Sequence, residues 1–291
     1  MHNAALYALT VLIWGSTWYA VTLQLGVVHP ILSVSYRFAL AALLLFIYTY
    51  GIRRNRQRVF SFKQHLFIAL LGLCLFCVNY ILFYFGTEHL TSGLVAIIFS
   101  TITLMNIFNQ AIFFKIKVKK RVTAGSIVGL SGILFVFWPE VMAFKSTALQ
   151  GILLCLLASY SASLGNMVSI KNRKCKIPVL EANTYGMAYG AFFSLILALY
   201  LGVPFTFDTS FSYVSSMLYL ACFGSAIAFG CYLTLMQNIG ADKAAYSTVL
   251  FPIVALGIST ILEGYVWSAT AIVGVSLALI GNIIAMTDNK R

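Results

Sequence analysis

Apolar segments dominate the chain and alternate regularly with short polar connectors. Each of ten such runs is about 17 to 25 residues long, enough to cross the hydrocarbon layer of a bilayer as a helix. We expect these helices at residues 4–23, 32–50, 65–85, 92–114, 122–138, 149–170, 179–203, 213–237, 244–262 and 268–286. The pattern predicts an all-α membrane protein with ten transmembrane helices.

The composition supports this prediction. Hydrophobic residues make up 61% of the 291 residues and charged residues only 9%, which a water-soluble domain could not tolerate without exposing much apolar surface. The net charge of +12 does not indicate nucleic-acid binding, because the basic residues occupy short connectors and do not follow one face. Five of the six cysteines lie inside apolar runs and Cys175 lies in a basic connector, so we expect free thiols, and we expect no metal or cofactor.

The basic connectors predict the orientation in the membrane. They follow the second, fourth and sixth apolar runs, and these three connectors lie on the same side if ten helices alternate in direction. Lysine and arginine are enriched in cytoplasmic connectors, so we expect both termini in the cytoplasm. The basic residues concerned are Arg53, Arg54, Arg56, Arg58, Lys63, Lys115, Lys117, Lys119, Lys120, Arg121, Lys171, Arg173, Lys174 and Lys176.

The ten runs divide evenly at a polar junction near residues 140–147. Five helices in each half force the halves into opposite orientations, which is the plan of inverted-repeat transporters. A shift of 149 residues superposes Gly125 on Gly274 and Gly132 on Gly281, and also Ala96 on Ala245. We therefore predict two inverted five-helix repeats, residues 1–140 and 146–291.

Several short motifs carry a family resemblance. They are WGSTW at 14–18, SYRFALAALLL at 35–45, LYLACFGSAIAF at 218–229, GADKAAYSTVLFPIVA at 240–255 and LEG at 262–264. In this order and spacing, the chain resembles the EamA family of the drug/metabolite transporter superfamily over essentially its whole length. The resemblance implies ten helices in two inverted repeats, a substrate cavity between the halves, and export of amino acids or other small metabolites across a bacterial inner membrane.

The two halves differ in features that this family often carries. Its usual proline in the fourth helix is replaced by Thr103, and its glutamate after that helix by Phe114 and Lys115, whereas the second half keeps Pro252 and Glu263. A proline inside an apolar helix removes a backbone hydrogen bond, which makes Pro252 a candidate gate. The two halves need not gate alike.

Four polar side chains recur at helical spacing in the fourth apolar run. Ser100, Thr103, Asn106 and Gln110 are three or four residues apart and therefore share one helical face. Polar side chains at membrane depth face the interior of a bundle, where each one either bonds a neighbouring helix or lines a wet cavity. The two readings stand about even for any one residue, and for the four together we favour a cavity.

Residues on other runs extend this candidate site. Aromatic rings suit an apolar or cationic ligand through stacking and cation–π attraction. Aromatic residues make up 15% of the chain, however, so packing is the simpler reading for any single ring. The candidate substrate-binding residues are Trp14, Asn79, Tyr80, Phe83, Ser100, Thr103, Asn106, Tyr160, Ser163, Phe229 and Tyr246.

Two ionisable residues lie near the membrane on the predicted non-cytoplasmic side. Arg37 lies about two turns inside the second run, and Glu263 ends the ninth. An arginine at mid-membrane costs about 2.5 to 3.5 kcal/mol, so it needs a carbonyl, a carboxylate or access to headgroups. Arg37 could bind a substrate carboxylate or take part in proton coupling, but we favour a structural anchor at the helix end, with Glu263 as a candidate partner.

Glycines at small-xxx-small spacing predict close helix contacts. Gly125, Gly129 and Gly132 share one spacing, and Gly186 and Gly190 repeat it. Such faces allow helix backbones to approach closely, either within the chain or in a homodimer, and we favour packing within the chain.

The leading functional hypothesis is a secondary transporter that exports small amphipathic metabolites by alternating access, amino acids with hydrophobic or aromatic side chains included. A passive channel is an alternative that the sequence does not exclude. An intramembrane enzyme is disfavoured, because the four histidines are scattered and only Glu263 of the seven acids approaches the core. The expected partners are a small-molecule substrate and the lipid bilayer, without nucleic acid. A proton or another coupling ion, and a monomer or a homodimer, are left open.

Overall fold

All the regular structure in the described residues is helical. The computed structural model describes residues 3–52, 59–115, 117–118, 120–138, 142, 146–239 and 247–286. Its α-helices are α1 (Asn3–Thr22), α2 (Pro30–Phe46), α3 (Phe62–Leu71), α4 (Asn79–Thr87), α5 (Ser92–Phe99), α6 (Ile102–Phe114), α7 (Lys120–Val136), α9 (Ser146–Lys174), α10 (Val179–Tyr200), α11 (Phe211–Tyr219), α12 (Ala228–Ile239), α14 (Ser247–Leu262) and α15 (Ala269–Met286). Three π-helical segments continue these helices: η1 (Ile47–Ile52), η2 (Gly72–Val78) and η3 (Leu220–Ile227).

Many of these helices have the length and composition of membrane spans. Seven helical segments qualify: Asn3–Thr22, Pro30–Ile52, Phe62–Thr87, Ser92–Phe114, Ser146–Lys174, Val179–Tyr200 and Phe211–Tyr232. Val249–Leu262 and Ala269–Ala285 are apolar but shorter. The prediction of an all-helical membrane protein is therefore confirmed.

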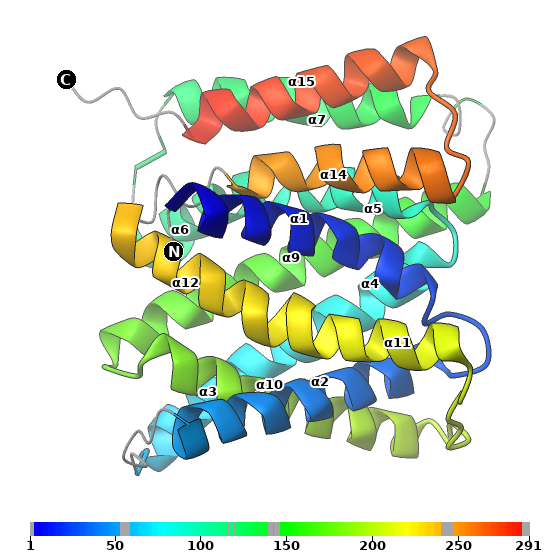
Figure 1. Cartoon of the computed structure of the whole chain (residues 1–291). Coiled ribbons are helices and arrows are strands. Elements are labelled where there is room, and N and C mark those ends of the chain that lie inside the picture. Colours follow the sequence, from blue (N-terminus) through cyan, green and yellow to red (C-terminus); the bar gives the residue numbers. More distant parts are fainter. Residues whose placement is uncertain are drawn as a thin grey trace.

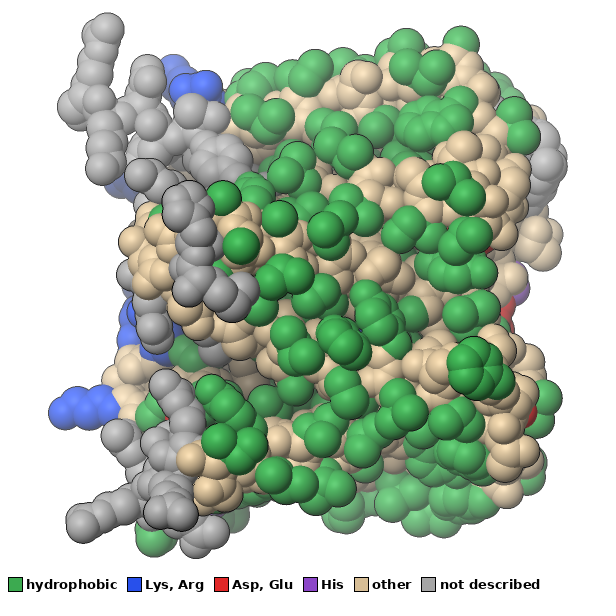
Figure 2. Space-filling view, in the orientation of Figure 1, with side chains coloured by type: hydrophobic (Ala, Val, Ile, Leu, Met, Phe, Trp, Pro, Cys, Tyr) green, Lys and Arg blue, Asp and Glu red, His purple; other side chains and the backbone are tan. Residues whose placement is uncertain are grey.

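The helices lie roughly parallel to one common axis and form a bundle (Figure 1). Helix α1 begins, and α15 ends, at the same end of the bundle (Figure 1). Lysine and arginine side chains lie at this end, and many apolar side chains are spread over the flank that is visible (Figure 2). We call it the basic end, after Lys63, Lys117, Lys120, Arg121, Lys171, Arg173, Lys174 and Lys176. We call the other end of the bundle, where α1 ends and α15 begins, the opposite end.

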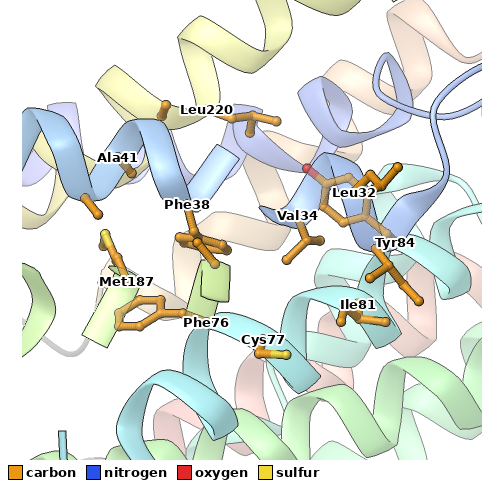
Figure 3. Packing of buried hydrophobic residues seen from close by; sticks show 14 of the residues in the cluster. Leu32, Val34, Phe38, Ala41, Phe76, Cys77, Ile81, Tyr84, Met187 and Leu220 are labelled. Carbon is orange, nitrogen blue, oxygen red and sulfur yellow. The ribbon is translucent and has the colours of Figure 1, made fainter. Parts of the chain in front are cut away.

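A hydrophobic core packs α2 against helices from both halves of the chain. Phe38 on α2 is fully buried, and its ring lies 5.3 Å from that of Phe76 on η2 (Figure 3). Met187 on α10 and Leu220 on η3 complete the same cluster. This packing fixes α2 next to α10 and η3.

Glycines let two pairs of helices meet backbone to backbone. A Cβ atom added to Gly125 on α7 would lie 2.6 Å from the carbonyl oxygen of Gly281 on α15, and one added to Gly132 would lie 2.5 Å from that of Gly274. Gly190 on α10 is similarly close to Phe76. The prediction that these glycine stripes pack helices within the chain is confirmed.

The fourth predicted helix is interrupted without a proline. Helix α5 ends at Phe99 and α6 begins at Ile102, and the hydroxyls of Ser100 and Thr101 donate to the carbonyls of Ile97 (2.6 Å) and Ile98 (2.7 Å). Hydroxyl groups that bond back to the preceding turn compete with the helical hydrogen bonds and bend helices. Ser100 and Thr101 thus interrupt the helix close to Thr103, the position where the family often has a proline.

Candidate functional site

A central cavity of about 830 Å³ lies inside the bundle. Its size falls within the range of small-molecule binding sites, about 300 to 1,000 Å³. Helices from both halves contribute to it, including α1, α2, α4 and α6 from the first half and α9, α12 and α14 from the second. Its aromatic lining comprises Trp14, Trp18, Phe76, Tyr80, Phe83, Phe99, Phe229, Tyr232 and Phe251.

The cavity opens toward the basic end. Lys117 and Arg121 line it there and are exposed. Toward the opposite end its lining includes Val21 and Thr87, both of which are buried. A ligand would therefore enter this conformation from the basic end.

The polar face predicted on the fourth run largely faces the cavity. Thr103, Asn106 and Gln110 on α6 line it, as does Asn166 on α9. The Asn166 side-chain amide donates to Oδ1 of Asn106 over 3.2 Å. Ser100 lies in the break before α6, and its hydroxyl donates to the backbone carbonyl of Ile97. It is not part of the described cavity lining.

One polar pair beside this face escaped the sequence analysis. The Nδ2 atom of Asn109 donates to Oγ of Ser163 over 2.9 Å, and both residues are buried. Together with the pair Asn106 and Asn166, it forms an antiparallel ladder of hydrogen bonds between α6 and α9. Ser163 thus holds α9 against α6, and the described cavity lining does not include it.

Aromatic side chains form the wall of the cavity nearest α1. The Trp14 ring lies 5.2 Å from the rings of Phe229 and Tyr232 and 5.5 Å from that of Phe251. Its indole nitrogen donates to the carbonyl of Gly224 over 2.9 Å. Because Trp14 belongs to the first half and its neighbours to the second, this cluster joins the two halves around the cavity.

A second aromatic group lies one turn further along α1. The Trp18 ring is 5.1 Å from the rings of both Phe83 and Phe99. Of the aromatic candidates predicted from the sequence, Trp14, Tyr80, Phe83 and Phe229 all line the cavity, as expected for an apolar binding surface.

Arg37 lies deeper than expected and reaches the cavity. Its side chain is only 2% exposed, lines the cavity, and holds its guanidinium carbon 4.6 Å from the centre of the Tyr80 ring and 5.2 Å from that of Phe38. Among the described residues, its Nε and Nη1 atoms have no hydrogen-bond partner. This arrangement does not fit an anchor at the lipid interface, where the charge would reach headgroups.

Asn79 also lines this cavity and has a buried acceptor without a donor among the described residues. Its Nδ2 atom donates to the carbonyl of Leu75 over 3.0 Å. Its Oδ1 atom is buried, and no described residue donates to it. Asn79 and Tyr80 both line the cavity directly after η2, and π-helical segments are common beside functional sites.

Glu263 is bound elsewhere, so the suggested pairing with Arg37 is wrong. Both oxygens of the Glu263 carboxylate accept from the backbone N–H of Ser92 over 3.1 Å, and the Ser92 hydroxyl donates to one of them. This contact ties the end of α14 to the start of α5 at the opposite end. Thr91, which precedes α5, makes no side-chain capping bond.

Three further candidates lie apart from the cavity or outside the described residues. Tyr160 on α9 is 46% exposed and lies outside the described lining. Tyr246 falls outside the residues that the structure describes. Pro252 is buried within α14, next in sequence to the cavity residue Phe251. Over the part of the chain that can be described, no three His, Cys, Asp or Glu side chains gather to hold a metal ion.

Apolar helices around a cavity with polar and aromatic walls define an integral membrane protein that can hold a small molecule within its bundle. The sequence matches the profile of the EamA-like transporter family over residues 3–138 and 149–287, and the chain therefore belongs to this family. It is a multi-span membrane transporter of the drug/metabolite transporter type.

Similar proteins are found in several bacteria. Protein PagO of Salmonella typhimurium is 24% identical, covering 98% of this chain and 95% of its own length. An uncharacterized inner membrane transporter, YedA of Escherichia coli K12, is 27% identical over 89% of this chain and 82% of its own. One crystal structure shares the fold, with a TM-score of 0.67 at 14% identity over 97% of this chain and 96% of the other.

Proposed function

We propose that this protein is a secondary transporter that exports small amphipathic metabolites across the inner membrane by alternating access. The cargo class includes amino acids with hydrophobic or aromatic side chains. The observation that carries the proposal is the cavity, which both halves line and whose described lining is exposed at the basic end and buried toward the opposite end. A carrier that rocks around a fixed midplane site needs such a one-sided cavity.

We also propose that the chain crosses the membrane ten times, in two inverted repeats. Shifting by 149 residues maps Gly125 onto Gly274 and Gly281 onto Gly132. The contact of Gly125 with Gly281 therefore maps onto the contact of Gly274 with Gly132, and both contacts are present. Reciprocal contacts of this kind are what a two-fold axis between two similar units produces.

The π-helical segments support the repeat independently. The same shift carries η2 from residues 72–78 to 221–227, and η3 occupies Leu220–Ile227. Helix packing follows the relation too, since α1 packs on α12 and α14 while α9 packs on α4 and α6. We keep residues 1–140 and 146–291 as the two repeats. We propose that both termini are cytoplasmic, because α1 begins and α15 ends at the basic end.

The proposed substrate contacts are the cavity residues Trp14, Asn79, Tyr80, Phe83, Thr103, Asn106 and Phe229. Ser100 and Ser163 would act indirectly, by bending the α5–α6 rod and by holding α9 against α6. Pro252 lowers the resistance of α14 to bending and is the proposed gate. In this conformation the contact of Glu263 with Ser92 would keep the opposite end closed.

Transport by purified protein in liposomes tests the proposal. We expect labelled phenylalanine or leucine to exchange faster than in protein-free liposomes, and unlabelled cargo on the far side to accelerate the exchange. Acceleration from the far side distinguishes a carrier from a passive channel, which would show none. Repeating the assay with and without a pH gradient tests a proton as the coupling ion.

Matched variants connect transport to the cavity. Asn106→Ala removes a polar group from the lining, whereas Ser126→Ala removes a buried hydroxyl outside the described lining that donates to the carbonyl of Val122 within α7. Asn106→Ala is expected to slow exchange more than Ser126→Ala does. Equal effects, or no exchange by the unmodified protein for any amino acid tested, would overturn the proposed function.

A further inference from the structure

Arg37 is a buried cation whose side chain is not fully satisfied by the protein. At 2% exposure it cannot reach headgroups, and two of its nitrogens have no acceptor among the described residues. Buried charges are ordinarily paired, and a missing partner is strongly unfavourable. We propose that Arg37 binds an anionic group of the cargo and that the cargo is an amphipathic monocarboxylate. This proposal rests on the proposed function, because it specifies the ligand of the same cavity.

The surroundings of Arg37 hold the guanidinium without neutralising it. The faces of Tyr80 and Phe38 lie 4.6 and 5.2 Å from its carbon atom, and such contacts stabilise a cation while supplying no hydrogen-bond acceptor. The only carboxylate that the sequence suggested as a partner, that of Glu263, is bound to Ser92. The buried hydroxyl of Tyr84 also lies beside Arg37, as a neutral group. Nε and Nη1 have no acceptor among the described residues, and a planar guanidinium matches a carboxylate with two parallel hydrogen bonds.

A glycine keeps space open beside the guanidinium. A Cβ atom added to Gly224 on η3 would lie 2.8 Å from Cγ2 of Thr17 and 3.7 Å from Nη2 of Arg37. A side chain at this position would therefore crowd the wall next to the charge. The carbonyl of Gly224 is already engaged by the indole of Trp14, so it does not neutralise Arg37.

The rest of the cavity suits the remainder of such a ligand. The Oδ1 atom of Asn79, which has no donor among the described residues, can accept a hydrogen bond from an ammonium or another N–H group. The rings of Trp14, Trp18 and Phe83 offer a surface for an apolar side chain. An amino acid uses all three features, and a carboxylic acid without an amino group uses two of them.

The charge pattern also argues against other cargo classes. An amine without a carboxylate would place a second cation near Arg37 and leave the guanidinium unpaired. A phosphorylated compound would favour several cations, and the other Lys and Arg residues in the described lining, Lys117 and Arg121, are exposed at the mouth. A single carboxylate matches the single buried arginine.

Three related probes test this assignment in the purified full-length protein. Phenylalanine carries both charged groups, 3-phenylpropionate only the carboxylate, and phenethylamine only the ammonium. Binding is measured from the change in tryptophan fluorescence, because two of the four tryptophans, Trp14 and Trp18, line the cavity. We expect both carboxylates to bind about tenfold or more tightly than the amine, because a hydrogen bond to a charged group contributes about 1.5 to 3 kcal/mol.

Variants of Arg37 then assign the preference to one residue. Arg37→Gln should weaken carboxylate binding by about tenfold or more and leave the amine nearly unchanged, and Arg37→Lys should retain part of the preference. Lys63→Gln is the control, because Lys63 is an exposed cation at the basic end and lies outside the described cavity lining. If Arg37→Gln does not fold, the preference of the unmodified protein for carboxylates decides the question.

The outcomes separate this proposal from the proposed function. Equal binding of the amine and the carboxylates, binding of no probe, or an Arg37→Gln variant that keeps the carboxylate preference would overturn the role of Arg37. Exchange of amines but not of carboxylates in liposomes would overturn it while leaving the transporter assignment intact. Carboxylate binding that depends on Arg37, without exchange of any probe, would support the anion site and contradict transport.

Discussion

Glu263, at the end of α14, caps the first turn of α5 through the backbone N–H and the hydroxyl of Ser92. The first N–H groups of a helix have no partner within it and attract negative charge. Here the carboxylate comes from the other half of the chain, and the contact lies at the end where the cavity is closed. It therefore joins the two halves on the closed side.

Removing this carboxylate should loosen α5. Glu263→Ala leaves the N–H of Ser92 without its acceptor, and the loss of a helix cap costs about 0.5 to 2 kcal/mol. We expect a lower apparent Tm in detergent and faster hydrogen exchange of the amides in residues 92–99. Glu88→Ala, which removes an exposed acid at the same end, is the control. Equal exchange rates in both variants would show that the contact does not hold α5.

The glycine contact between α7 and α15 should not tolerate a methyl group. A Cβ atom at Gly281 would lie 2.6 Å from the carbonyl oxygen of Gly125, so the two helices would have to separate. Overpacking of this kind typically costs about 1 to 3 kcal/mol. Gly281→Ala is therefore expected to lower the apparent Tm, measured by thermal unfolding in detergent.

The matched control lies on α14. Gly257 has no atom within 4 Å of an added Cβ among the described residues, so Gly257→Ala should be neutral or slightly stabilising. If Gly281→Ala melted at the temperature of the unmodified protein, the packing of α7 on α15 would be looser than the structure indicates.

Pro252 should affect the rate of transport more than the affinity for cargo. Pro252→Ala restores a backbone hydrogen bond within α14 and stiffens it. We expect a several-fold lower kcat for exchange with KM nearly unchanged. Ile253→Ala, at an exposed neighbouring position, is the control for a change in the same helix. A kcat unaffected by Pro252→Ala would remove this residue from the gate.

Two aromatic candidates should behave differently. Phe83 is buried and lines the cavity, whereas Tyr160 is 46% exposed on the outside of α9. Phe83→Leu is expected to raise the KM for aromatic cargo severalfold, and Tyr160→Leu to leave it unchanged. Liposome exchange kinetics measure both. A larger effect at Tyr160 would mean that cargo contacts a different face of α9.

The sequence predicted the apolar helices and much of the polar face on α6, because both depend on periodicity. Thr103, Asn106 and Gln110 share a face within one helix and line the cavity as expected. Ser100 is out of phase, because its hydroxyl and that of Thr101 interrupt the helix before α6. A local break of this kind rotates the positions after it relative to those before it, so a helical period counted across the break fails.

Contacts between distant segments could not be predicted in the same way. Arg37 lies two turns from the start of α2, which suggested an interfacial anchor, but Tyr80 and Phe38 cover it. Asn109 lies beside the predicted polar face, and it donates a hydrogen bond to Ser163 because α9 packs along α6. Depth and pairing depend on how helices assemble, and a helical period does not specify that.

Alternating access to the cavity can be measured most directly with a single cysteine at position 103. Thr103→Cys is introduced into a variant whose native cysteines are replaced by alanine and which retains exchange. It is then treated with a membrane-impermeant thiol reagent from either side of oriented vesicles. We expect labelling from the side of the basic end without cargo, and increased labelling from the other side with cargo. Labelling from neither side, or equally from both sides whether or not cargo is present, would contradict the account.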